Sequence, residues 1–170
     1  MNIVLIGYRG TGKSAVGEIL AHRLLMTYVG MDAEIVKRSG MTIPEIVEEY
    51  GWPVFRDMET AVARDLSGQD NLIIDTGGGV IERPENVEML RQNACVIWLK
   101  ASVNIIVFRI QADIQRPALI EGKTFTEEVA EVLERRFPKY KSAAHHEIDT
   151  DDVTPDGLAD GIVKILENKQ

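Results

Sequence analysis

The chain has 170 residues, of which 45% are hydrophobic, and its 27 acidic residues outnumber its 19 lysines and arginines, giving a formal net charge of -8. A chain of this length fits one domain that buries ~70% of the surface of the unfolded chain. The acidic balance disfavours nucleic acid as a partner, because a protein that binds phosphodiesters needs a basic face. We therefore expect residues 1–170 to form one domain, in which a few placed arginines hold any anionic ligand.

Cysteine use and hydropathy bear on the location of the protein. The single cysteine, Cys95, lies within an apolar run at residues 94–99, where it is typical of a buried strand residue in a reducing compartment. No charged-then-apolar leader precedes the first strand-like run, and no apolar run approaches the ~18 residues that a membrane span needs. We expect a cytoplasmic monomer without a membrane partner.

Apolar strand-like runs alternate with helical patterns along the chain, which is typical of parallel strands joined by crossover helices. The predicted strands are residues 2–6, 27–29, 72–74, 94–99 and, more weakly, 147–148. The predicted helices, several of which open with Pro or a Ser/Thr cap, are residues 13–25, 44–50, 53–66, 84–92, 103–112, 126–143 and 155–168. The pattern predicts an α/β fold.

The first predicted strand runs into the motif G-x-x-x-x-G-K-S at residues 7–14, which is typical of a phosphate-binding loop. Its glycines let the backbone turn with N–H groups facing inward, so that they and the positive end of the next helix cradle a polyphosphate. Lys13 would then reach the β- and γ-phosphates, and Ser14 would ligate Mg²⁺. The alternative is a glycine-rich turn with a chance lysine. The expected nucleotide-binding residues are Gly10, Thr11, Gly12, Lys13, Ser14 and Ala15.

Two segments stand outside the alternation of strands and helices. Residues 31–66 have the pattern of successive helices between two strands, and residues 113–124 have no regular pattern. In an open parallel sheet the ligand binds beyond the carboxyl ends of the strands. We expect both segments to cap the phosphate loop, the first holding the acceptor and the second closing as a lid.

Two carboxylates, Asp32 and Glu34, come just after the second predicted strand. A carboxylate there accepts hydrogen bonds from hydroxyls, orients an attacking oxygen or binds a water molecule of Mg²⁺. Taken alone, acidic residues at a helix start are also common as simple charge partners of the helix N-terminus.

Arg56 and Glu59 lie one turn apart on the helix that follows Gly51. The planar guanidinium suits a carboxylate or a phosphate, and Glu59 is placed to hold it. An ordinary surface ion pair is the alternative.

Asp75 ends the third predicted strand, just before three consecutive glycines at residues 77–79. These glycines expose backbone N–H groups to a ligand, and a strand-end aspartate steadies the Mg²⁺ shell in many phosphate-loop proteins. A flexible turn is the alternative.

Three arginines lie late in the chain: Arg109, Arg116 before Pro117, and Arg136. In an acidic protein such arginines are placed to neutralise phosphate charge as a segment closes. Solvated surface charge is the alternative for each. The pair His145-His146 could suggest metal binding, but without Cys or His partners we interpret it as helix-end charge.

In this order the motifs resemble those of the shikimate kinase family. The resemblance covers nearly the whole chain: the phosphate loop followed by Ala15-Val16-Gly17, the acidic pair, the Phe55-Arg56…Glu59 unit, the Gly77-Gly78-Gly79 turn, Arg116-Pro117 and Arg136-x-Pro138-x-Tyr140. It implies a three-layer α/β/α kinase fold with a five-stranded parallel sheet in the order 2-3-1-4-5. It also implies transfer of the ATP γ-phosphoryl group to the 3-hydroxyl of shikimate, in aromatic amino-acid biosynthesis.

The resemblance further assigns acceptor-binding roles. It implies that Asp32 lies beside the accepting hydroxyl and the metal-bound water, and that Glu34 binds the ring hydroxyls. Arg56, Arg136 and the amides of the turn formed by Gly77, Gly78 and Gly79 would bind the shikimate carboxylate.

On the nucleotide side, the resemblance implies that Arg116 reaches the transferring phosphate from the lid and that Arg109 lies against adenine. Lys13, Asp32 and Arg116 are thus the expected catalytic residues. Ser14, with Asp32 and Asp75 acting through water, is expected to hold Mg²⁺.

Two other functions stay open at this point. One is another small phosphate-loop kinase, acting on a nucleoside monophosphate, gluconate or aminoshikimate; a nucleotide acceptor would need a base-reading pocket, whereas paired carboxylates and arginines suit a small polyol with one carboxylate. The other is a module in which ATP only switches a partner interaction, which would not require the acceptor arginines.

Overall fold

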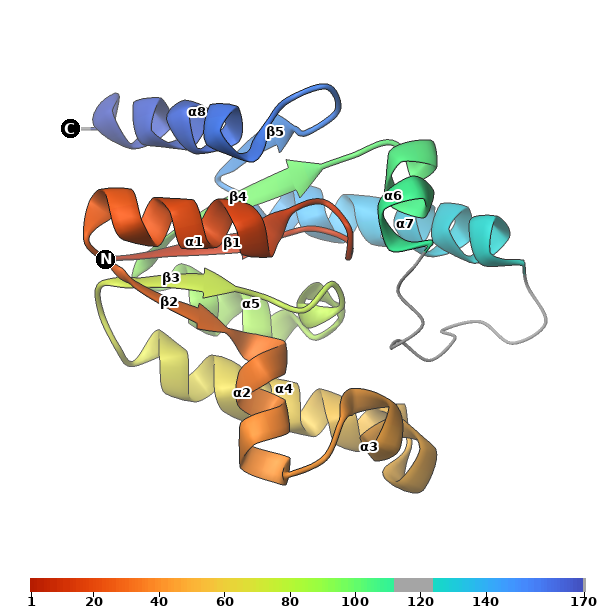
Figure 1. The fold of residues 1–170 in the computed structure, drawn as a ribbon. Helices are drawn as coiled ribbons and strands as arrows, with labels where there is room; N and C mark the ends of the chain where they lie inside the picture. The colour runs from red at the N-terminus through yellow and green to blue at the C-terminus, as the bar shows by residue number, and fades with distance from the viewer. Residues whose placement is uncertain (112–123, 170) are drawn as a thin grey trace.

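The computed structural model describes residues 1–111 and 124–169 and contains one five-stranded parallel sheet (Figure 1). The strands are β1 (Asn2–Ile6), β2 (Thr27–Gly30), β3 (Leu72–Asp75), β4 (Ala94–Lys100) and β5 (His146–Asp149). Their order in the sheet is β2-β3-β1-β4-β5, and every neighbouring pair is parallel. The strand order implied by the sequence motifs is therefore confirmed.

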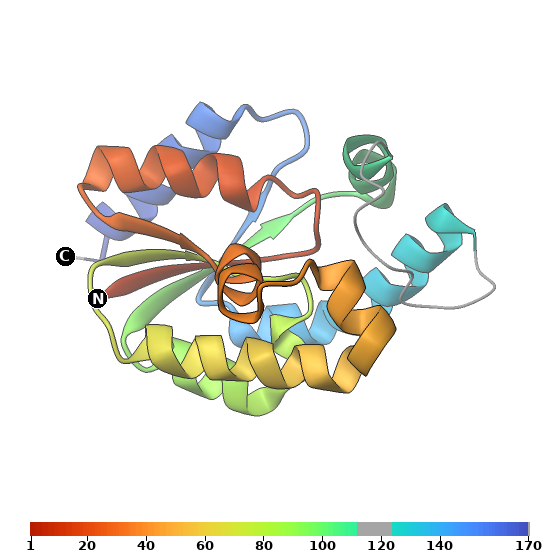
Figure 2. The same ribbon diagram turned by 60° about the horizontal axis from the view of Figure 1, so that its bottom comes forward.

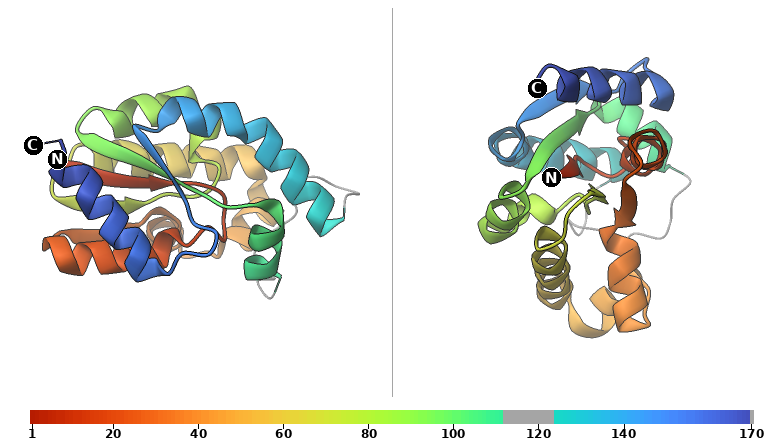
Figure 3. Two further views of the ribbon diagram at one scale, coloured as in Figure 1. Left: turned by 90° about the horizontal axis from the view of Figure 1, so that it is seen from above. Right: turned by 90° about the vertical axis from the view of Figure 1, so that its left-hand side faces the viewer.

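Helices cover both faces of this sheet, which gives three layers (Figures 1 and 3). Helices α1 and α8 pack on one face, and α4, α5 and α7 pack on the other. The helices are α1 (Lys13–Leu24), α2 (Met31–Ser39), α3 (Ile43–Tyr50), α4 (Trp52–Ser67), the short 3-10 helix η1 (Val80–Glu82), α5 (Pro84–Arg91), α6 (Val103–Ile110), α7 (Phe125–Ala143) and α8 (Pro155–Glu167). No helix among these described residues is both long enough and apolar enough for a membrane span.

The central strand β1 divides the apolar interior into two halves. All five of its residues are buried, and successive side chains alternate between the faces. Val4 and Ile6 join the core beneath α4, α5 and α7, whereas Ile3 and Leu5 join the core beneath α1 and α8. A strand that is apolar on both faces is typical of a sheet covered by helices on both sides.

The acceptor segment predicted at residues 31–66 consists of α2, α3 and most of α4. Helix α2 leaves the end of β2 directly, and the chain then returns through α3 and α4 (Figure 2). The start of α2 could not be predicted separately, because its N-cap is Gly30 without a side-chain hydrogen bond. The other predicted helices begin and end within about two residues of the observed ones where the structure describes them. The predicted lid at residues 113–124 lies outside the described residues except for Thr124.

A cluster of charges joins η1 to α7. The carboxylate of Glu82 lies 3.3 Å from Arg135 Nη2, 3.5 Å from Arg136 Nε and 3.5 Å from Lys139 Nζ. Burial by itself would raise the pKa of Glu82, yet the cations of Arg136, Arg135 and Lys139 outweigh it and hold that pKa below its ordinary value. The ionised form of Glu82 therefore stabilises the folded chain.

This cluster predicts a pH-dependent contribution to stability. A carboxyl group whose pKa is lowered by folding stabilises the protein above its unfolded pKa of about 4.3, and that contribution disappears as the pH falls through the lowered folded value. We expect Glu82→Gln to reduce the free energy of unfolding at pH 7 by about 1 kcal/mol, the scale of a partly exposed charge network. Urea unfolding of both proteins from pH 7 to pH 3 measures the difference, which should shrink at the acid end. Glu88→Gln, at an exposed position of α5, is the matched control, and a pH-independent penalty for Glu82→Gln would contradict the assignment.

Candidate active site

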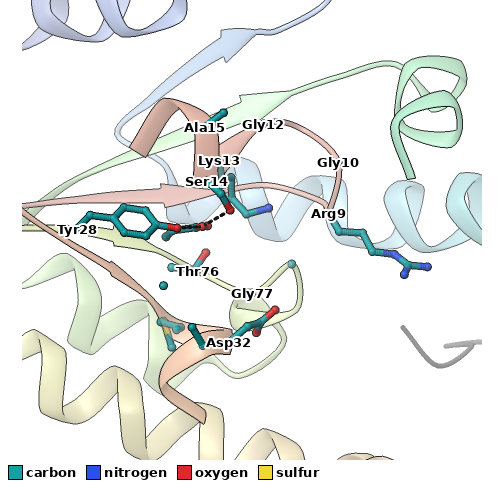
Figure 4. Close-up of a pocket in the computed structure, with 15 residues that line it drawn as sticks. Arg9, Gly10, Gly12, Lys13, Ser14, Ala15, Tyr28, Asp32, Thr76 and Gly77 are labelled. Carbon is teal, nitrogen blue, oxygen red and sulfur yellow. Dashed lines mark hydrogen bonds between the residues drawn. The ribbon is translucent and has the colours of Figure 1, made fainter. Parts of the chain in front are cut away.

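A cleft of about 440 Å³ opens at the carboxyl ends of the central strands (Figure 4). Its walls come from three segments: the loop between β1 and α1, the end of β2 with the start of α2, and the turn after β3. These are the segments in which the sequence placed the phosphate loop, the first carboxylate and the glycine turn. The cleft thus lies where a parallel α/β sheet binds its ligands.

The phosphate loop has the backbone geometry that its glycines allow. Gly10 and Gly12 have φ angles of 80° and 91°, in the left-handed region. A Cβ atom on Gly10 would lie 2.5 Å from Ile110 Cγ2, so a side chain would also collide with α6. Helix α1 begins with neither a side-chain cap nor an acidic residue in its first turn. Its first N–H groups and positive end are therefore directed at the cleft without a cap from the helix's own side chains, which favours an anionic ligand.

Thr11 shapes this loop instead of lining the cleft. Its hydroxyl donates a hydrogen bond to Tyr8 O at 2.9 Å, its backbone N–H points to the same oxygen at 3.4 Å, and the residue is 1% exposed. The Thr11 side chain therefore lies away from the cleft, whereas the neighbouring Gly10, Gly12, Ser14 and Ala15 line it.

Lys13 and Ser14 stand at the start of α1. Lys13 Nζ donates to the carbonyl oxygens of Gly7 (2.8 Å) and Tyr8 (3.0 Å), which holds the ammonium group within the curl of the loop. Ser14 Oγ donates to Asp75 Oδ2 at 2.6 Å, so the strand-end carboxylate lies next to the hydroxyl. The loop thus carries a positive charge at its centre and a serine–aspartate pair at its edge.

The polar groups in the cleft fit a magnesium ion bound together with a nucleotide. Ser14, Asp75 and Asp32 supply the hard oxygen atoms that Mg²⁺ prefers, and all three line the cleft. Within the part of the chain that the structure describes, no group of three or more His, Cys, Asp or Glu residues forms a metal cage. Mg²⁺ at phosphoryl-transfer sites is held by one or two carboxylates and by substrate phosphates, so this sparse donor set is the appropriate one.

Asp32 faces the phosphate loop from the first turn of α2 (Figure 4). The turn after β3 makes room for it: a Cβ atom on Gly77 would lie 2.9 Å from Asp32 Oδ1 and 2.8 Å from Glu59 Oε2. Two carboxylates therefore approach the backbone of this turn closely only because residue 77 has no side chain.

Arg56 reaches the same turn from α4. Its Nη1 donates to Glu59 Oε1 at 2.9 Å, and the Glu59 side chain is 1% exposed, which excludes an ordinary surface ion pair. The guanidinium also lies 5.4 Å from the Trp52 ring centroid and 5.3 Å from that of Phe55. A Cβ atom on Gly79 would lie 2.3 Å from both Nη1 and Nη2 of Arg56. Aromatic rings and a buried carboxylate thus fix this cation against the glycine turn.

Arg136 approaches the turn from α7. Its side chain is 3% exposed, and its Nη1 lies 3.5 Å from the position of a Cβ atom on Gly78. The hydroxyl of Tyr140, one turn further along α7, donates to Gly78 O. Burial raises the pKa of Tyr140 to about 12, so the hydroxyl keeps its proton as a donor. The motif that contains Arg136 and Tyr140 therefore fixes both a cation and the carbonyl of the turn.

The structure separates Glu34 from the cleft. Glu34 Oε1 accepts from Arg38 Nε at 3.0 Å, one turn along α2, and Arg38 also pairs with Asp65. Residues two apart on a helix leave it in different directions, and the lining of this cleft includes Asp32 but not Glu34. The binding of the acceptor's ring hydroxyls by Glu34 stays a prediction.

Of the other predicted arginines, Arg109 lies beside the phosphate loop. Its Nη1 donates to Gly10 O at 3.1 Å and to Thr150 Oγ1 at 3.2 Å. Arg116 lies outside the described residues.

The histidine pair is not helix-end charge. Helix α7 ends at Ala143, Val96 N donates to His145 Nδ1 at 2.9 Å, and His146 begins β5. Burial lowers the pKa of both histidines, and an Nδ1 that accepts a hydrogen bond belongs to a neutral ring.

Tyr28 and Arg9 are among the cleft residues that were not predicted from sequence. Tyr28 on β2 donates its hydroxyl proton to Asp75 Oδ2 at 2.7 Å, and burial together with this hydrogen bond raises the Tyr28 pKa far above its ordinary value. Arg9 lines the cleft, and its guanidinium carbon lies 5.7 Å from the Phe125 ring centroid. The signal for Tyr28 was only a tyrosine two residues before a strand end, and Arg9 occupies a variable position of the loop motif.

Comparison with known proteins agrees with this geometry. A family model described as shikimate kinase matches residues 9–167. A shikimate kinase of Caldicellulosiruptor bescii is 39% identical over 96% of this chain and 94% of its own length. The structure of shikimate kinase from Acinetobacter baumannii in complex with shikimate matches with a TM-score of 0.95 at 34% identity, covering 99% of this chain and 94% of that one. The enzyme from Aquifex aeolicus matches with a TM-score of 0.83 at 28% identity, covering 99% and 98% of the two chains. The chain belongs to the shikimate kinase family of ATP-dependent kinases.

Proposed function

We propose that this chain transfers the γ-phosphoryl group of ATP to the 3-hydroxyl of shikimate, with Mg²⁺ as the metal ion. The observation that carries the proposal is the convergence of Arg56 and Arg136 on the glycine turn, directly beside the phosphate loop. A phosphate loop alone is common to many kinases and switches, whereas two fixed guanidinium groups at the acceptor side select a small molecule that bears a carboxylate.

On the nucleotide side, the proposed contacts are backbone amides and the side chains of Lys13 and Arg109. The N–H groups of residues 10–15 and the first turn of α1 would surround the β- and γ-phosphates, with Lys13 turning from the loop carbonyls toward the phosphate oxygens. Arg109, already bonded to the loop at Gly10 O, is proposed to lie against the adenine. Thr11 contributes through the shape of the loop.

The proposed magnesium site consists of Ser14 as a direct ligand, with Asp75 and Asp32 binding its water molecules. When bound, Mg²⁺ neutralises charge on the β- and γ-phosphates. Ser14 and Asp75 already form a hydrogen bond, so the protein orients the hydroxyl before any ion arrives.

On the acceptor side, Arg56 and Arg136 with the amides of residues 77–79 would bind the shikimate carboxylate. Asp32 faces the phosphate loop from the opposite wall and is proposed to orient the attacking hydroxyl and accept its proton. Phosphoryl transfer requires positioning and charge neutralisation more than covalent chemistry, which is what these groups supply. Arg116 is proposed, from the family resemblance alone, to reach the transferring phosphate.

One parallel sheet carries the described parts of the site, which supports a single domain, and we propose that the protein acts as a monomer. The buried free thiol of Cys95 supports a reducing compartment such as the cytoplasm.

A coupled assay of ADP release tests the proposed acceptor. With Mg·ATP, turnover should be fastest with shikimate and much slower with quinate, aminoshikimate, gluconate and nucleoside monophosphates. ATP binding without turnover on any acceptor would indicate a switch module, and preference for gluconate or a nucleotide would contradict the acceptor assignment.

Removing the charge of Lys13 tests the nucleotide side. Lys13→Met keeps the unbranched stem and should lower kcat at least ~10²-fold, as does the loss of other preorganised donors to developing charge. Lys37→Ala, at an exposed position of α2, should leave the rate unchanged. Steady-state kinetics at saturating shikimate measures both variants, and a near-normal rate for Lys13→Met would exclude the proposed phosphate contact.

Arg56→Lys tests the carboxylate contact. A lysine cannot reproduce two parallel hydrogen bonds, so shikimate binding should weaken by about 2–5 kcal/mol if the pair is desolvated. An analogue whose carboxylate is replaced by a neutral group should bind the two proteins almost equally. The four affinities, measured by calorimetry, form a double-mutant-type cycle that isolates the contact. Equal penalties for the acid and the neutral analogue would leave Arg56 as a structural partner of Glu59 only.

A further inference from the structure

The carboxylate of Asp75 accepts two hydroxyl donors on one oxygen atom. Ser14 Oγ donates to Oδ2 at 2.6 Å, and Tyr28 Oη donates to the same Oδ2 at 2.7 Å. Figure 4 shows these bonds as dashed lines, with Tyr28 and Ser14 approaching from opposite sides. Asp75 itself is 8% exposed, so this small network is almost enclosed by protein.

The sheet register places Tyr28 for this contact. On the paired strands, Tyr28 is opposite Ile73 and Gly30 is opposite Asp75. Tyr28 and Ile73 belong to the core beneath α1, and Asp75, two residues after Ile73, points to that same face. The tyrosine therefore reaches its partner diagonally along one face of the sheet, where long side chains meet.

Two glycines form the slot that the tyrosine ring occupies. A Cβ atom on Gly17, one turn after Ser14 on α1, would lie 2.8 Å from Tyr28 Cε2. A Cβ atom on Gly30 would lie 3.4 Å from the Tyr28 hydroxyl. The ring is thus held between backbone segments on two sides, and its hydroxyl has one well-defined direction.

This network determines how the metal-binding groups point. Ser14 gives its only hydroxyl proton to Asp75, so its lone pairs face away from the carboxylate, where a cation can use them. Tyr28 engages the same carboxylate oxygen, which opposes rotation of Asp75 toward direct coordination of an ion. Both hydrogen bonds from the described residues end on Oδ2, so Oδ1 can accept from a metal-bound water molecule.

We propose that Tyr28 is a positioning residue of the magnesium site, which fixes Asp75 so that Ser14 ligates Mg²⁺ directly and Asp75 binds it through water. This inference rests on the proposed placement of Mg²⁺ at Ser14. Tyr28 touches neither substrate in this role and acts only through Asp75.

Nucleotide binding measured by calorimetry tests the proposal without relying on turnover. The dissociation constant of ADP is measured with and without Mg²⁺, and their ratio gives the enhancement due to the metal. We expect Tyr28→Phe, which removes one oxygen atom, to reduce this enhancement about tenfold, as do other losses of groups that orient metal ligands. Its affinity for ADP without metal should stay unchanged. Tyr50→Phe, at an exposed tyrosine of α3, is the matched control and should behave as the unmodified chain does.

A double-mutant cycle with Asp75→Asn separates positioning from packing. If Tyr28 acts through the Asp75 charge, Tyr28→Phe should have almost no further effect on the metal enhancement in the Asp75→Asn background. An unchanged enhancement in Tyr28→Phe alone, additive effects in the cycle, or weaker ADP binding without metal would overturn the inference. No metal enhancement in the unmodified chain would instead contradict the proposed magnesium site itself.

Discussion

Charged side chains from three helices reach the three-glycine turn after β3, and each approaches a point where a side chain would stand. Asp32 and Glu59 meet the position of a Cβ atom at Gly77, Arg136 lies near that of Gly78, and Arg56 overlaps that of Gly79. The turn therefore provides one backbone surface against which these charged groups lie. The close approach of side chains from α2, α4 and α7 depends on the absence of side chains at residues 77–79.

The chain is acidic overall, yet the partly buried Arg56 and the buried Arg136 both lie at its three-glycine turn. Removing the Arg56–Glu59 pair from water has a desolvation free energy that can exceed the attraction between the two charges. The pair is therefore weak evidence for stability. The pair instead sets geometry, because Glu59 and the rings of Trp52 and Phe55 hold the guanidinium group of Arg56 in one orientation. A guanidinium group that is already fixed in the free protein loses less conformational entropy when it binds a planar carboxylate.

Much of the fold follows from local sequence signals, and the departures have physical reasons. Thr42, Ser102, Thr124 and Thr154 each accept a backbone N–H as an N-cap, which is why their helix starts could be predicted closely. Strand order is a property of long-range pairing, and here only the resemblance to a family supplied it. Lys13 and Ser14 follow from a contiguous motif, whereas the meeting of Arg56 with Arg136 joins residues 80 positions apart and has no local signature. The pairing of Glu34 with Arg38 depends on the rotation of α2, which its position after a strand does not reveal.

The single cysteine has a practical consequence for spectroscopy. Cys95, the second residue of β4, is 1% exposed, so a thiol-reactive dye or spin label will not reach it in the folded protein. A thiol-reactive label should therefore give almost no signal with the unmodified folded chain. A cysteine introduced at the exposed position 48 of α3 would be the only reactive thiol, and a fluorophore there would report how the acceptor-side helices respond when a ligand enters the cleft.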